Sequence, residues 1–176
     1  ALALNERKAY KKAARVLEKL LETNSTYDEA RLQYAFTLES LKKYKQMDSQ
    51  LEILLERNPN NAPALNLYAY SLAQRGLRLD DASEYIARAL AVNPDDNSFI
   101  DTQAWVYFKQ GNLQDAAELL RSIPLETLQA NAEIAYHLGA VLFELGDMDG
   151  ARRYLEMSYK ENKEAEKLYR KLPPAK

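Results

Sequence analysis

The chain of 176 residues contains no cysteine, which excludes disulfide bonds, thiolate nucleophiles and cysteine-ligated metals. It has one histidine, His137, and therefore no site built from several imidazoles. Only 5 Gly and 6 Pro interrupt a sequence rich in Ala, Leu, Glu, Lys and Arg, a composition that favours helix. No apolar run approaches the roughly 18–20 residues that cross a bilayer, so we expect no direct membrane insertion of this chain.

An excess of charge of one sign is also absent, because 24 Lys and Arg nearly balance 26 Asp and Glu and the net charge is −2. Binding to nucleic acid requires a basic surface, so we expect no nucleic-acid partner. Residues 1–22 and residues 160–176 each carry six Lys or Arg against three Glu, a charge of +3 at either end. The net charge then leaves −8 for the middle of the chain, which favours basic partners.

A repeat of fixed length is present instead. "YAYSLAQRG" (68–76), "QAWVYFKQG" (103–111) and "LGAVLFELG" (138–146) follow one another at intervals of 35 residues, and each ends in glycine. Apolar residues before each glycine recur at helical spacing, and glycine is the residue that ends a helix in the left-handed conformation. We expect the inward stripe to contain Leu65, Tyr68, Ala69 and Leu72, then Ile100, Gln103, Ala104 and Tyr107, then Ala135, Leu138, Gly139 and Leu142.

Small residues recur where two helices should meet. Ala69, Ala104 and Gly139 stand at one position of the first helix of each unit, and the second helix opens with Ala82, Ala116 or Ala151. "NPNNAP" (58–63) and "NPDDNS" (93–98) lie between units, where proline ends one helix and Asn, Asp or Ser caps the next.

Helix–turn–helix units of about 34 residues with these signals match the tetratricopeptide pattern. We therefore predict an all-α, right-handed superhelix of tetratricopeptide repeats, a single solenoid over residues 1–176 that is a fragment of a longer chain. The expected parts are a lone second helix of a partial repeat (5–24), repeats at 28–61, 62–96, 97–131 and 132–163, and a capping helix at 164–172.

Residues 28–160 also resemble a narrower family. "NPNNAPALNLYAYSLAQRGLRLDDASEYIARALAVNPDDNSFIDTQAWVYFKQG" and "AEIAYHLGAVLFELGDMDGARR" are similar to the C-terminal repeats of proteobacterial outer-membrane lipoproteins that serve as adaptors of a carboxy-terminal processing protease. The sequence departs from the family pattern at Tyr68–Ala69 and Gln103–Ala104, where Leu–Gly is commoner, and at Pro124, which shortens a second helix. The resemblance implies a periplasmic, outer-membrane-associated protein whose partner is a protease or its substrates; a cytoplasmic location is the alternative.

The concave face of such a solenoid is its usual docking surface, and the stripe beside the buried one should line it. That stripe is aromatic, and aromatic side chains supply large contact areas at low rotamer cost. The alternative for each ring is simple core packing. The predicted partner-binding residues are Phe36, Asn66, Tyr70, Asp101, Trp105, Phe108, Lys109, Tyr136 and Phe143, with Asn66, Asp101 and Lys109 setting register by hydrogen bonds.

Other chemistry is less well supported. A carboxylate clamp of Lys, Asn and Arg is disfavoured, because only Asn66 matches it and Asp101 stands at the equivalent place in the next unit. His137 is interpreted as a packing residue, and the acidic pairs at 80–81 and 95–96 as helix-terminal charges. No catalytic group, cofactor site or metal site is predicted, so we do not expect an enzyme.

Two functions remain open from sequence. The favoured one is a non-catalytic scaffold that binds a protein or peptide in the aromatic groove. The alternative is a structural end-cap or self-association module of a longer array. In that case a homodimer would form through the N-terminal half-repeat, whose stripe of Ala13, Val16, Leu17 and Leu20 lacks a first helix.

Overall fold

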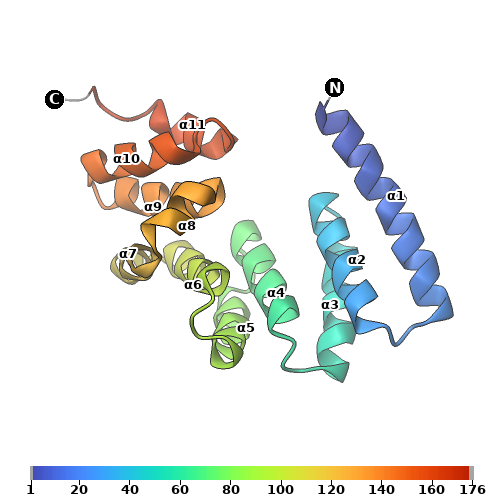
Figure 1. Cartoon of the computed structure of the whole chain (residues 1–176). Helices are drawn as coiled ribbons and strands as arrows, with labels where there is room; N and C mark the ends of the chain where they lie inside the picture. Colours follow the sequence, from blue (N-terminus) through green and yellow to red (C-terminus); the bar gives the residue numbers. More distant parts are fainter. Residues whose placement is uncertain (1, 175–176) are drawn as a thin grey trace.

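The computed structural model describes the backbone of residues 2–174 and the side chains of residues 7–174. The described part contains eleven α-helices and no strand, arranged as an arc from α1 to α11 (Figure 1). Ala1 and residues 175–176 of the predicted solenoid lie outside it. The helices are α1 (Leu2–Thr23), α2 (Asp28–Ser40), α3 (Tyr44–Arg57), α4 (Ala62–Arg75), α5 (Leu79–Val92), α6 (Asn97–Gln110), α7 (Leu113–Ser122), α8 (Leu125–Ala130), α9 (Ala132–Glu144), α10 (Met148–Ser158) and α11 (Lys163–Tyr169).

Neighbouring helices pair along the chain. The first helices of the four pairs are α2, α4, α6 and α9, and each packs most extensively against its second helix, α3, α5, α7 or α10. First helices also contact one another, α2 with α4, α4 with α6 and α6 with α9, so they form a continuous layer. The N-terminal helix α1 packs on α2, and α11 packs on α9 and α10. None of the described helices is both long and apolar enough to cross a bilayer.

Left-handed residues end the first helices. Gly76, Gly111 and Gly146 have φ values of 63°, 86° and 82°, which glycine adopts without steric cost. Lys42, which stands where the degenerate first unit lacks a glycine, takes the same conformation with φ 58°. All four pairs therefore have a left-handed residue in the turn after the first helix, although in the first pair that residue is lysine instead of glycine.

Polar caps begin the following helices. Asn61, Asp96, Asn131, Asp147 and Asn162 each accept a hydrogen bond from a backbone N–H in the first turn of the helix that they precede. Such a cap satisfies donors that have no partner within the helix. Pro124 separates α7 from the short α8, because proline cannot continue a helix.

The core confirms the expected role of the small residues. Ala69, Ala104, Ala82, Ala116 and Ala151 are fully buried. At Gly139, an added Cβ would lie 2.8 Å from Leu155 Cγ and 3.1 Å from the Leu155 backbone nitrogen. Helices α9 and α10 approach so closely that a side chain at residue 139 would force them apart.

The buried stripe of α6 differs from the expectation. Ile100, Gln103 and Tyr107 are partly exposed, whereas Thr102, Trp105 and Val106 are buried. Helix α6 contacts α4 and α9 as well as α5 and α7. Because four helices surround it, the face turned toward the other first helices is buried more completely than spacing within one pair predicts.

Candidate functional site in the layer of first helices

Trp105 lies at the centre of a group of rings contributed by α4, α6 and α9. Its indole stacks on Phe108 with ring centroids 4.7 Å apart and on His137 at 3.9 Å, and Tyr136 tilts against it at 5.8 Å. Tyr70 approaches His137 at 6.2 Å. These five residues are called the aromatic cluster below. Trp105 itself is 2% exposed, so its ring holds the layer together and offers almost no surface.

A buried hydrogen bond fixes the histidine of this cluster. His137 Nδ1 lies 2.8 Å from Asp101 Oδ1 and 3.0 Å from Oδ2, and both side chains are buried. The pair joins α6 to α9 across 36 residues of sequence. His137 thus has the packing role expected from sequence, and its hydrogen bond to Asp101 holds that carboxylate in place.

A second polar link crosses the layer beside the cluster. The Tyr70 hydroxyl donates a hydrogen bond to Glu133 Oε1 and accepts one from Gln74 Nε2. Burial, followed by the nearby Glu133 charge, raises the pKa of Tyr70 well above its usual range. The phenol therefore stays neutral and acts as a donor that positions the Glu133 carboxylate.

Next to this link lies a hollow of about 230 Å³, here called the acidic hollow. Each of the four first helices contributes to it, together with the Asn131 cap of α9. Burial, and then repulsion by Glu133, raises the pKa of Glu39, while Lys42 opposes the shift. The lining residues are Phe36, Glu39, Asn66, Leu67, Tyr70, Ser98, Asp101, Thr102, Asn131, Glu133 and Ile134.

The aromatic cluster also borders a second hollow, the C-terminal hollow, with a volume of about 490 Å³. Phe108, Tyr136, Ala140 and Glu144 line one side of it, and five residues between 164 and 171 line the other. Burial, followed by Glu164, raises the pKa of Tyr136. Because this hollow carries Lys167, Arg170 and Lys171 beside two glutamates, it has no single charge character.

Lys109 and Phe143 line neither hollow. The Lys109 ammonium lies 4.6 Å from the Trp105 ring centroid and 5.7 Å from that of Phe108, a cation–π arrangement. Burial lowers the pKa of Lys109. Phe143 is partly buried against the C-terminal part of the core.

The nine predicted binding residues thus separate into groups. Phe36, Asn66, Tyr70 and Asp101 meet at the acidic hollow, and Phe108 and Tyr136 meet at the C-terminal hollow. The expectation that the Trp105 ring contacts a partner directly does not fit the structure, since the cluster encloses it. Sequence spacing placed Trp105 on the face of α6 that meets α4 and α9. It did not predict how deeply the ring is buried, which depends on how closely these helices approach.

The stripe predicted to line the concave face included Glu39 but not Glu133, and neither was among the predicted binding residues, although both line the acidic hollow. Glu133 stands one helical turn before Tyr136 and His137 on α9, so extending the same stripe toward the helix start would have found it. Glu39 follows Phe36 by three residues on α2 and shares its face for the same reason.

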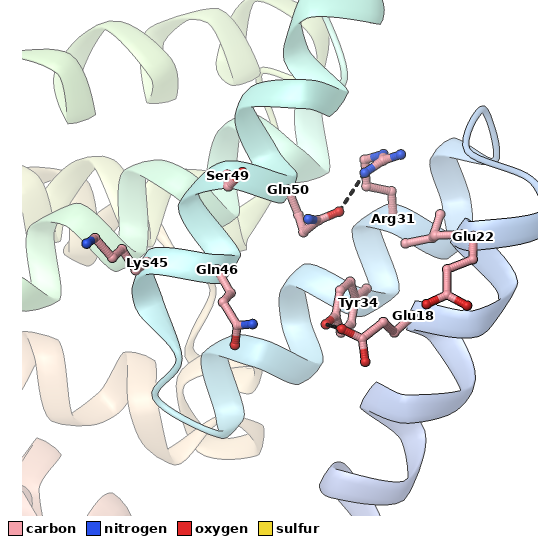
Figure 2. A pocket seen from close by; sticks show the side chains of 9 residues that line it. Glu18, Glu22, Arg31, Tyr34, Lys45, Gln46, Ser49 and Gln50 are labelled. Carbon is pink, nitrogen blue, oxygen red and sulfur yellow. Dashed lines mark hydrogen bonds between the residues drawn. The ribbon is translucent and has the colours of Figure 1, made fainter.

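A further hollow, of about 440 Å³, lies among α1, α2 and α3. Figure 2 shows Arg31 directed toward Gln50, and Tyr34 toward Glu18. The distances are 2.5 Å from Arg31 Nη1 to Gln50 Oε1 and 3.3 Å from the Tyr34 hydroxyl to Glu18 Oε1. Arg31 and Tyr34 already have partners here, and only α1, α2 and α3 line the hollow, whereas all four first helices line the acidic hollow; it is therefore the weaker candidate.

Comparison with known proteins identifies the same architecture. A family model described as "Anaphase-promoting complex, cyclosome, subunit 3" matches residues 76–158. TPR repeat-containing protein PA4667 of Pseudomonas aeruginosa is 42% identical over 81 residues, which are 45% of this chain and 13% of that protein. This chain therefore spans only a small part of that relative.

Solved structures extend the similarity to nearly the whole chain. TTC0263, a thermophilic TPR protein of Thermus thermophilus, has a TM-score of 0.75 at 19% identity, over 96% of this chain and 94% of its own. YrrB, described as a TPR protein with an unusual peptide-binding site, has a TM-score of 0.62 at 17% identity, over 89% of this chain and 81% of its own. The predicted all-α tetratricopeptide solenoid is thereby confirmed as the fold.

Proposed function

We propose that this chain is a non-catalytic scaffold that binds a protein or peptide partner on the face formed by α2, α4, α6 and α9. The observation that carries the proposal is the acidic hollow, which all four first helices build together. Tetratricopeptide solenoids generally present such faces to protein partners. The peptide-binding site named for YrrB, a protein of similar fold, also supports it.

The surface around the acidic hollow has the properties of a peptide-docking site. Phe36 is 41% exposed, and hydrogen bonds with Glu133 and Gln74 hold the Tyr70 ring that also lines the hollow. Covering a ring of this kind stabilises a complex by roughly 1.5–3 kcal/mol when burial is complete. The rigid layer beneath lowers the entropy cost of binding, because the partner meets side chains that are already fixed.

Selection of binders from a library of random linear peptides, followed by calorimetry, tests this proposal. We expect Phe36→Ala to weaken binding of a selected peptide by about tenfold or more, which corresponds to about 1.4 kcal/mol. Tyr27→Ala is the matched control, since Tyr27 is 45% exposed but lines neither hollow. Equal losses for both variants, or a loss only for Tyr27→Ala, would place the docking surface elsewhere.

A more specific role also follows from the sequence resemblance. We propose that the chain acts in the bacterial envelope, in the periplasm and associated with the outer membrane, where it brings a processing protease and its substrates together. The resemblance of residues 28–160 to lipoprotein adaptors supports this role. Fractionation of source cells tests the location, and a cytoplasmic pool alone would contradict it. Site-specific crosslinking from residue 36 tests the partner, and we expect a protease or its substrate in the crosslinked product.

Self-association is the second candidate function, and one surface favours it. Val16, Tyr10 and Leu20 of α1 are 60%, 42% and 37% exposed, and an open, mainly apolar hollow of about 600 Å³ lies between α1 and α2. Light scattering tests whether two copies meet there. A dimer that becomes monomeric on Val16→Asp, but not on the solvent-exposed Lys19→Asp, would support the second function.

A further inference from the structure

The acidic hollow has an excess of negative charge. Glu39, Asp101 and Glu133 line it, and no Lys or Arg side chain does so in the part of the chain whose side chains are described, residues 7–174. Burial, and after it the charge of Glu133, raises the pKa of Glu39, so these two carboxylates lie close enough to repel each other. A cation placed between them would remove this repulsion.

The uncharged polar groups of the hollow are also suited to a ligand that donates hydrogen bonds. Asn66 Oδ1 is inaccessible to solvent and has no hydrogen-bond partner among the described residues. The Tyr70 hydroxyl already donates to Glu133, and the Thr102 hydroxyl donates to the Ser98 carbonyl oxygen at 3.0 Å. The Tyr70 and Thr102 hydroxyl protons are therefore already used, while the Glu39 and Glu133 carboxylates keep lone pairs that a ligand with several N–H groups would satisfy.

We propose that the acidic hollow binds the guanidinium group of an arginine side chain presented by the partner peptide. This inference rests on the proposed function and names the residue that the docking face recognises. Arginine fits better than lysine because its planar group carries five donors and can bond to more than one carboxylate at once. The guanidinium also stacks favourably on aromatic faces, which Phe36 and Tyr70 supply at the hollow.

Two other occupants fit less well. No group of three or more acidic or imidazole side chains in the described part of the chain is placed to hold a metal ion. The volume of about 230 Å³ is below the roughly 300–1,000 Å³ of typical small-molecule sites, and it suits one long side chain. The negative charge of the chain between residues 23 and 159 agrees with a basic partner at longer range.

The test uses selected linear peptides and a neutral replacement for arginine. Peptides from a random library are sequenced, and each arginine of the tightest binder is replaced in turn by citrulline, which keeps the shape of the side chain but has no charge. Binding is measured by calorimetry for the parent protein, Glu133→Gln and Glu39→Gln. Glu144→Gln is the matched control, because it removes the same charge from the C-terminal hollow.

We expect arginine to be enriched among the selected peptides. We also expect one citrulline replacement to weaken binding by about tenfold or more, and that loss should shrink in Glu133→Gln and Glu39→Gln but not in Glu144→Gln. Peptides that depend on Phe36 but bind equally well with citrulline at every position would overturn the arginine inference and leave the proposed function standing. If no peptide binds, or if binding does not depend on Phe36, both are overturned.

Discussion

Trp105 should act as a structural residue, and its truncation should lower stability before it affects recognition. The side chain is 2% exposed and stacks on Phe108 and His137. Replacing a buried tryptophan by alanine costs about 3–5 kcal/mol. For a domain of this length each kcal/mol lowers the melting temperature by about 2–4 °C, so we expect Trp105→Ala to melt about 6–20 °C below the parent.

Circular dichroism of the helices provides the assay. Phe36→Ala is the control, because that ring is 41% exposed and its loss should cost about 1 kcal/mol or less. Calorimetry with a selected peptide, at a temperature where both variants are folded, then separates stability from binding. A Trp105→Ala protein that melts with the parent but no longer binds the peptide would refute the structural role and restore Trp105 as a contact residue.

Three further predictions follow from single contacts. Gly139→Ala should destabilise the protein by about 1–3 kcal/mol in urea unfolding, because the added Cβ would lie 2.8 Å from Leu155 Cγ. Most of this cost should disappear when Leu155→Ala is also present, and additive costs of the two substitutions would contradict the packing argument. The folded-state pKa of Glu39 is raised above its usual value of 4.5, so protonation of this side chain favours the fold. Ionisation of Glu39 therefore lowers the stability of the protein as the pH rises above 4.5, and that stability returns as the pH falls. Glu39→Gln should thus be more stable than the parent at neutral pH, with the difference vanishing below pH 4.5, whereas a difference independent of pH would show that the carboxylate charge is not responsible. Asn131→Ala should cost about 1 kcal/mol in thermal unfolding, because it removes the cap of α9, and an unchanged melting temperature would show that this cap contributes nothing.

Local signals in the sequence predicted most of the fold. Helix ends follow from short-range chemistry, such as the left-handed glycine at residue 76 and the Asn61 cap, and these positions behave as expected. The structure also confirms the prediction that residue 139 must be small, because the close approach of α9 and α10 leaves no space for a side chain there. Lys42 shows the limit of residue-type rules, since it takes a left-handed conformation that the sequence did not indicate.

The site was harder to predict because it depends on the curvature of the array. Periodicity identified the face that carries Tyr70, Asp101 and Trp105, but exposure on that face depends on how tightly α4, α6 and α9 approach one another. The buried Asp101 side chain bonds to His137, which is 36 residues away in the sequence. The Tyr70 hydroxyl bonds to Glu133, which is 63 residues away. Contacts of this range leave no signal within a single repeat.

Mapping a bound peptide onto the backbone amides by NMR tests the central claim most directly. If the layer of first helices is the docking face, titration with a selected arginine-containing peptide should shift the amide signals of Phe36, Tyr70, Asp101 and Glu133. Signals from α3, α5 and α7 should change little. Shifts confined to those second helices would contradict the account.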